Sequence, residues 1–143
     1  KAKQKFGISG VVTGALFSEY QSSRIAKICT SLDLECFNPL WHKDQASYMK
    51  EVIKSGYKIW FSSIAADGLS EEWLGREITL EDIDKLVKLH SKNGLNVAGE
   101  GGEFESLVVD CPLFKKKIEV VDSSIKMENG YTGKYLINKA KLN

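Results

Sequence analysis

The residues best suited to chemistry lie together in one short stretch, Glu100-Gly101-Gly102-Glu103-Phe104-Glu105. Three carboxylates and two glycines fall within six residues. Adjacent glycines let the backbone adopt positive φ and approach a ligand closely. Carboxylates that crowd together repel one another, a cost that cations or hydrogen-bond donors relieve. The stretch therefore suits a loop that binds a cation, an amine or a donor group of a substrate, but its composition fits a solvated acidic turn equally well.

A second set of candidates follows an apolar, β-rich run at residues 10–16. Gly14 and Ala15 would let a planar ligand approach the backbone, and Tyr20, Gln21 and Arg24 would line the same cleft at the start of a helix. The N-terminus of a helix favours an anion such as a phosphate. Ordinary packing of a strand on its helix accounts for these residues equally well.

Two further candidates, Trp41 and Asp44, lie at the end of a second predicted strand. Ligands of parallel sheets collect at the carboxyl ends of the strands. His42 lies between them, but a single histidine beside a helix start is seldom a base or a metal ligand. The other histidine, His90, is predicted to be structural. With two separate histidines and no Cys-x-x-Cys pair, a zinc site is not expected.

Arg76 ends the segment Trp73-Leu74-Gly75-Arg76, an aromatic and an arginine around a glycine. Its planar guanidinium is suited to a carboxylate or a phosphate. The alternative is a structural clamp with one of the neighbouring acidic residues, Glu71, Glu72 or Glu77.

Composition describes an ordinary globular protein. The chain has 143 residues, of which 43% are hydrophobic and 27% charged. Twenty Lys and Arg against 19 Asp and Glu leave a net charge of +1, which gives no bulk electrostatic case for nucleic acid or a membrane. Three scattered cysteines fit a reduced compartment better than a disulfide framework. We therefore expect a cytoplasmic protein without a membrane segment.

Hydrophobic periodicity predicts an α/β fold. Strands at 10–16, 36–41 and 57–66 alternate with helices at 20–32 and 44–56, which indicates a parallel sheet with crossover helices. After Asp67 the pattern changes to a capped helix at 79–94 and short strands at 96–99, 106–109, 117–121 and 135–142. We expect one domain over residues 1–67 and a small mixed α+β domain over residues 68–143.

Taken together, the ordered motifs resemble the diphthine–ammonia ligase family, ATP-binding proteins of the PP-loop (N-type ATP pyrophosphatase) superfamily. The resemblance covers essentially the whole chain, and its most specific parts are the acidic loop and the later Pro-Leu-Phe. The motifs are Val12-Thr13-Gly14-Ala15-Leu16, Ser18, Tyr20-Gln21, Arg24, Pro39-Leu40-Trp41 with Asp44, Trp73-Leu74-Gly75-Arg76, Glu100–Glu105, and Asp110-Cys111-Pro112-Leu113-Phe114.

The resemblance implies a partial Rossmann-like (adenine nucleotide alpha hydrolase-like) sheet followed by a family-specific α+β domain. It implies the last step of diphthamide synthesis on elongation factor 2. ATP would adenylate the diphthine carboxylate, and ammonia would displace AMP after pyrophosphate is released. The expected cofactors are ATP and Mg²⁺, the expected partners are elongation factor 2 and ammonium, and a homodimer is possible.

Individual roles follow from residue chemistry combined with the resemblance. Substrate would be bound by Glu100, Gly101, Gly102, Glu103, Glu105, Arg76, Trp41 and Asp44. The nucleotide would be bound by Gly14, Ala15, Tyr20, Gln21 and Arg24. No catalytic residue is assigned.

One departure from the family pattern is large. The family's phosphate-binding Ser-Gly-Gly-Lys-Asp-Ser loop is missing from this sequence. We therefore expect the chain to be a C-terminal portion that does not complete the reaction alone. The alternatives are an ATP pyrophosphatase acting on another substrate, such as tRNA, and a non-catalytic binding module.

Overall fold

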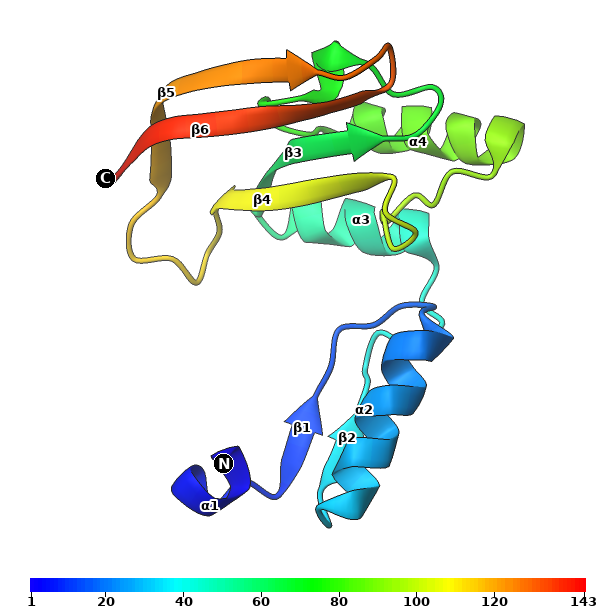
Figure 1. Cartoon of the computed structure of the whole chain (residues 1–143), viewed down its shortest axis with the longest axis vertical. Coiled ribbons are helices and arrows are strands. Elements are labelled where there is room, and N and C mark those ends of the chain that lie inside the picture. The colour runs from blue at the N-terminus through cyan, green and yellow to red at the C-terminus, as the bar shows by residue number, and fades with distance from the viewer. The chain divides into compact units, whose positions relative to one another are not determined.

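The computed structural model describes residues 1–143 and divides into two compact units, residues 1–44 and residues 45–143 (Figure 1). The first unit contains α1 (Ala2–Phe6), β1 (Gly10–Val12), α2 (Glu19–Ser31) and β2 (Glu35–Phe37). The second contains α3 (Gln45–Lys54), β3 (Lys58–Ala65), the 3-10 helix η1 (Glu71–Trp73), α4 (Leu80–Asn93), β4 (Phe104–Asp110), β5 (Ile118–Met127) and β6 (Thr132–Leu142).

The first unit is a strand–helix–strand arrangement, as predicted. β1 and β2 pair in parallel, with Val11 opposite Cys36. α2 connects them and begins after Ser18, whose hydroxyl accepts the backbone N–H of Gln21 at 3.4 Å. Both strands have only three residues, fewer than the sequence pattern indicated.

β3 does not extend this parallel sheet, and its prediction as the third parallel strand was wrong. It belongs to a separate antiparallel sheet with the order β4-β3-β6-β5. Ile64 lies opposite Phe104 of β4 on one side and opposite Gly133 of β6 on the other. Because β3 joins the later strands, the compact units divide between Asp44 and Gln45 instead of near Asp67. The mixed α/β class, with a small parallel sheet and an antiparallel one, is confirmed.

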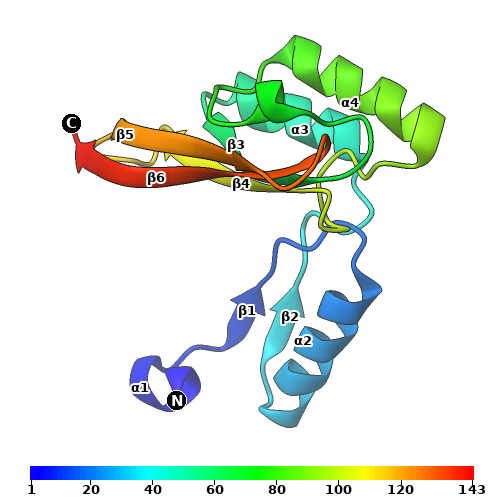
Figure 2. The same ribbon diagram turned by 45° about the horizontal axis from the view of Figure 1, so that its top comes forward.

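The core of the second unit lies between the antiparallel sheet and the helices α3 and α4, which cover one face of that sheet (Figure 2). The rings of Phe61 and Phe104 stack with centroids 4.0 Å apart. Ile83 and Leu86 of α4 are completely buried against them. Burial of this apolar stripe, more than helix propensity, stabilises α4 in place.

The N-terminal end of α4 is held by the buried carboxylate of Asp82. Thr79 and Asp82 form the predicted capping box, in which each side chain bonds the other's backbone N–H. The guanidinium of Arg76 donates to both oxygens of Asp82, at 2.7 and 3.0 Å, and the ammonium of Lys85 donates at 3.2 Å. Burial alone would raise the pKa of Asp82, but these hydrogen bonds outweigh it and hold that pKa well below its usual range.

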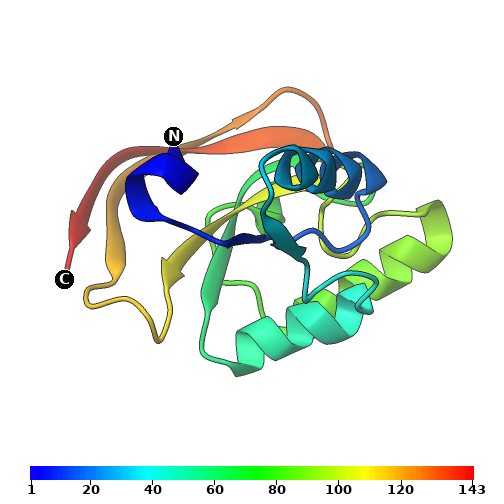
Figure 3. The ribbon, with the colours of Figure 1, turned by 90° about the horizontal axis from the view of Figure 1, so that it is seen from below.

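β5 and β6 form a long hairpin at the edge of this sheet, and it extends past the ends of β3 and β4 (Figure 3). The register shifts on both sides of Asp122, and β5 bends midway along its length (Figure 1). Such bulges increase local twist and interrupt an exposed edge. None of the helices in either unit has the length and apolar character needed to cross a membrane.

Replacement of Asp82 by asparagine tests the clamp. Asp82→Asn leaves the Arg76 guanidinium without its charged partner, and we expect a loss of about 2 kcal/mol in the free energy of unfolding, below the full value for a buried pair because Arg76 is partly exposed. The matched control is Asp84→Asn on the same helix, which breaks an exposed ion pair to Lys50 and should cost less than about 1 kcal/mol. Urea denaturation measures both, and equal losses would contradict the clamp.

The same carboxylate makes stability depend on pH. Because the pKa of Asp82 is lower in the folded chain than in the unfolded one, its contribution is complete above the unfolded value of about 4 and is lost as the pH falls through the folded value. The stability difference between the wild-type chain and Asp82→Asn should therefore shrink as the pH falls below about 4. A constant difference from pH 6 to pH 2 would contradict this explanation.

Candidate functional site

The acidic stretch lies in a tight loop that connects α4 to β4. Residues 96–99, predicted as a strand, form a turn instead. The side-chain oxygen of Asn96 accepts the backbone N–H groups of Ala98 at 3.0 Å and Glu100 at 3.2 Å. Gly99 and Gly102 have φ of 75° and 89°, values that strongly favour glycine. Hydrogen bonds to the Asn96 side chain therefore hold this segment as a turn, and the prediction of a strand over residues 96–99 was wrong.

Glu103 closes this loop. One carboxylate oxygen accepts the N–H of Asn96 at 3.1 Å and the other accepts the N–H of Gly101 at 2.9 Å. A Cβ at position 101 would lie 2.5 Å from the Glu103 carboxylate, so a larger residue there would displace this side chain from the loop. Two of the predicted substrate-binding residues, Gly101 and Glu103, therefore have clear structural duties.

The three predicted carboxylates have different surroundings. Glu100 is half-buried, and its backbone is held by Asn96. Glu105 is exposed on β4 and lies opposite Ser63 of β3. Glu103 lines a small pocket. The cluster that the sequence suggested is thus spread over the loop and the adjacent strand.

A small acidic pocket of about 190 Å³ lies beside the loop. Its walls are Ala66 and Asp67, just beyond β3, the last residue of α4, Asn93, with Gly94 and Leu95 that follow it, and Glu103. The side-chain amide of Asn93 donates to the backbone carbonyl of Asp67 at 2.7 Å, which ties the two walls together. The C-terminus of a helix carries a partial negative charge that favours cations. Two carboxylates at such a helix end make the pocket suitable for a small cation.

Asp67 and Asn93 were not among the predicted site residues. The signal for Asp67 was its position directly after a strand, where ligands of sheet proteins often lie. Asn93 had no comparable signal, because its role depends on contact with a residue 26 positions away. His90 has the structural role expected for it, with Nδ1 2.8 Å from the carbonyl oxygen of Leu95 just beyond the helix end.

Arg76 lies at the opposite end of α4 from this pocket. Its Nε donates to the carbonyl of Glu72, and its Nη atoms reach Glu77 O and the Asp82 carboxylate. A helix of 14 residues is about 21 Å long, which separates Arg76 from the pocket by most of that distance. The guanidinium is engaged as a clamp, with Asp82 as its carboxylate partner in place of the neighbouring glutamates.

The predicted nucleotide residues lie in the first unit, around the turn from β1 to α2. Gly14 is exposed, and a Cβ there would meet no atom within 4 Å. Ala15 is buried. Tyr20 and Gln21 are exposed at the start of α2, and the Arg24 guanidinium lies over the Tyr20 ring at 4.2 Å. The backbone around Gly14 therefore leaves room for a ligand.

Two buried polar side chains close to this turn have no hydrogen-bond partner. They are Thr13, through Oγ1, and Asn38, through both amide atoms. They directly follow the paired residues Val12 and Phe37, at the carboxyl ends of β1 and β2. Unsatisfied buried polar atoms are costly and rare in native proteins. These atoms fit a polar ligand such as a nucleotide at the strand ends.

Trp41 and Asp44 lie at the end of the first unit. The Trp41 indole stacks on the His42 imidazole with centroids 4.7 Å apart. His42 also stacks on Phe17 at 5.3 Å, and its φ is 60°. The imidazole is thus part of an aromatic stack, in agreement with the low expectation of a catalytic role.

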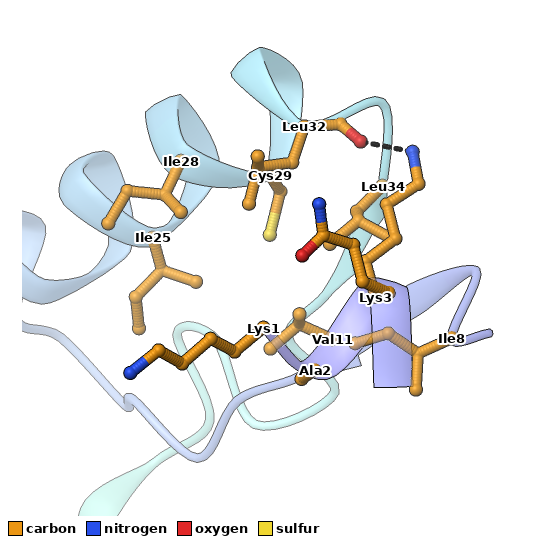
Figure 4. A pocket seen from close by; sticks show the side chains of 11 residues that line it. Lys1, Ala2, Lys3, Ile8, Val11, Ile25, Ile28, Cys29, Leu32 and Leu34 are labelled. Atoms are coloured by element: carbon orange, nitrogen blue, oxygen red, sulfur yellow. Dashed lines mark hydrogen bonds between the residues drawn. The ribbon is translucent and has the colours of Figure 1, made fainter. Parts of the chain in front are cut away.

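A larger pocket of about 360 Å³ in the first unit is apolar (Figure 4). It lies between α1 and α2 and contains the thiol of Cys29, whose pKa is raised by burial and further by the neighbouring Cys36. A thiol with a raised pKa is a poor nucleophile. Lys3 is held by the carbonyl of Leu32 (Figure 4). This pocket offers no acid–base chemistry.

The side chains do not fit a protein-built Mg²⁺ site. No group of three or more His, Cys, Asp or Glu side chains converges closely enough to hold a metal ion. Mg²⁺ commonly keeps several waters and binds through substrate phosphates.

The structure is that of an α/β protein with an acidic pocket at the end of α4 and an exposed glycine turn at the strand ends of the first unit. Residues 44–142 match the family described as diphthamide synthase C-terminal domain. The chain belongs to that family, which confirms the resemblance seen in its motifs.

Relatives named diphthine–ammonia ligase are similar over most of the chain. The mouse protein is 44% identical over 124 residues, which cover 85% of this chain and 45% of the relative. The human protein is 40% identical over 124 residues, which again cover 85% of this chain and 45% of the relative. The fission yeast protein is 41% identical over 118 residues, covering 82% of this chain and 19% of the relative. The chain thus spans less than half the length of these curated relatives.

The loop-closing role of Glu103 predicts a local effect on amide hydrogen exchange. Glu103→Ala removes both acceptors, and exchange at the amides of Asn96 and Gly101 should accelerate about tenfold or more, since a lost hydrogen bond to a charged group is worth about 1.5–3 kcal/mol. Glu105→Ala, with the same loss of charge on the adjacent strand, should leave both amides protected. Equal acceleration in the two variants, measured by NMR, would show that the loop is not closed by Glu103.

Proposed function

We propose that the chain provides the acceptor-binding part of a diphthine–ammonia ligase. In this reaction the carboxylate of diphthine on elongation factor 2 is converted to an amide with ammonium as the nitrogen source. Membership of the diphthamide synthase C-terminal domain family and relatives named diphthine–ammonia ligase support the proposal.

The observation that carries the proposal is the acidic pocket at the end of α4. Diphthine bears a trimethylammonio group, a cation with no hydrogen to donate. Such a group is held by negative charge and close packing instead of by directed hydrogen bonds. The pocket supplies Asp67, Glu103 and the negative end of the α4 dipole, and Ala66 and Leu95 give it apolar walls.

Within this pocket the two carboxylates contribute differently. Both carboxylate oxygens of Glu103 accept backbone N–H groups of the loop, so this side chain acts as a fixed negative charge. Asp67 is exposed and is the more accessible partner for a cation entering from solvent. Glu100 and Glu105 are proposed to add negative potential around the entrance and to attract the acceptor or ammonium. Neither needs direct contact for that effect.

The turn from β1 to α2 is proposed to hold the nucleotide. The exposed Gly14 backbone and the N-terminus of α2 would face phosphate, and Tyr20, Gln21 and Arg24 would border it. Thr13 and Asn38 have buried polar atoms without hydrogen-bond partners, and a bound nucleotide would supply those partners. When bound, ATP supplies the adenylyl group that activates the acceptor carboxylate.

The role of Asp67 can be tested in the complete gene product with diphthine-bearing elongation factor 2, ATP and ammonium. In Asp67→Asn the KM for elongation factor 2 should rise about tenfold, equivalent to about 1.4 kcal/mol, because the cation loses its accessible counter-charge. The maximal rate of AMP formation should change much less, since Asp67 is proposed to hold the cation and takes no part in the attack of the carboxylate on ATP.

The matched control is Asp84→Asn, which removes an exposed carboxylate from the outer surface of α4. Its KM should stay within about twofold of the wild-type value. A KM in Asp67→Asn equal to that of the control would reject the pocket as the acceptor site, and absence of AMP formation by the wild-type protein would reject the proposed reaction.

A further inference from the structure

Two lysines face each other on the β5–β6 hairpin without any acidic partner. Lys126 and Lys134 are directly opposite in the register of the two strands, and both are exposed. Like charges in that position destabilise a sheet. The other hairpin lysines are balanced, because Lys139 lies opposite Asp122 and Lys141 forms a 3.0 Å ion pair with Glu119. The pair at 126 and 134 is an unbalanced positive site.

This lysine pair lies close to the acidic pocket. Ser63 of β3 pairs with Lys134 on one side and with Glu105 on the other. Neighbouring strands are about 5 Å apart, which places Lys134 one strand and Lys126 two strands from β3. β3 runs directly into the pocket residues Ala66 and Asp67, and the β5–β6 turn lies at the same end of the sheet (Figure 1).

The hairpin as a whole is nearly neutral, because residues 118–142 contain four lysines and three acidic residues. Its positive charge is therefore local to the facing pair Lys126 and Lys134. Tyr131, 48% exposed in the turn between the strands, adds an amphipathic ring beside the lysine pair. Tyrosine is enriched in protein interfaces.

We propose that Lys126, Lys134 and Tyr131 form a docking face for an acidic surface of the protein acceptor. This inference rests on the proposed function, since the face would hold the body of the acceptor while the pocket holds its cationic side chain. Opposite charges on two adjoining surfaces orient a protein partner as well as attract it, because only one orientation satisfies both.

A protein fits this face better than a nucleic acid. The hairpin contains no arginine, the residue that most often pairs with phosphate and stacks on bases. Glu105 and the acidic pocket lie across β3 from Lys134 and would repel a phosphate backbone running in that direction. A bipolar surface suits a partner that itself has charges of both signs.

The test compares two double charge reversals that change the net charge equally. Lys126→Glu/Lys134→Glu alters the docking face, and Lys115→Glu/Lys116→Glu alters two exposed lysines that precede β5 at the other end of the hairpin. Binding of each chain to diphthine-bearing elongation factor 2 is measured at 50 and 300 mM salt. We expect the first variant to raise the Kd about tenfold or more at low salt and about threefold or less at high salt. The control should change it less than twofold.

Two further measurements keep the result interpretable. Circular dichroism and urea denaturation establish that both variants fold. Titration with tetramethylammonium reports the acidic pocket separately, and its Kd in Lys126→Glu/Lys134→Glu should be no higher than in the wild-type chain, because the pocket residues are unchanged and added negative charge favours a cation.

Several outcomes would overturn the inference. Equal weakening by both double variants would indicate attraction by net charge alone. Wild-type affinity in Lys126→Glu/Lys134→Glu would remove the docking face while leaving the proposed function intact. Competition by poly(U), or a change in oligomeric mass in that variant, would identify a nucleic acid or a second copy as the occupant. Failure of the wild-type chain to bind elongation factor 2 would overturn both proposals, whereas the tetramethylammonium titration would still report on the pocket.

Discussion

The pairing of β3 on both of its edges is the constraint on which the second unit depends. Hydrogen bonding to β4 on one side and β6 on the other fixes Phe61 against Phe104 and closes the core over α4. The same pairing determines what lies beyond the end of the strand. Asp67 is the second residue after β3. The loop before β4 brings Glu103 to it, and β6 brings the hairpin lysines to the same end of the sheet.

Carboxylates serve three physically different purposes around α4. At the start of the helix Asp82 is buried and satisfied by Arg76, Lys85 and the capping box, so it stabilises the fold and has no capacity for a ligand. Glu103 is intermediate, since it closes a loop and also faces the pocket. Asp67 is exposed and has the capacity to bind a ligand. The role of each carboxylate follows from the hydrogen bonds that it makes. Its residue type alone does not reveal that role.

The sequence predicted most elements of this structure but not their partners. The apolar periodicity of α4, its Thr79 cap and its final Gly94 were all local signals, and each was confirmed. The strand at β3 was also found, but a run of apolar residues contains no information about which strand it will pair with. Similarly, the acidic loop was conspicuous by composition, whereas the backbone N–H groups that occupy Glu103 depend on how the loop folds. The sequence around Arg76 is compatible with ligand binding and with a structural clamp, and the position of Asp82 in the folded chain decides for the clamp.

The pocket formed by Asp67, Glu103 and the end of α4 is proposed to bind a quaternary ammonium group. The most direct measurement is an NMR titration of the isotope-labelled chain with tetramethylammonium, with neutral tert-butanol as a control for size. We expect saturable shifts confined to the amides of Asp67, residues 93–95 and Glu103, absent with tert-butanol and lost in Asp67→Asn. Shifts that do not saturate, that occur elsewhere, or that persist in Asp67→Asn would contradict this proposal.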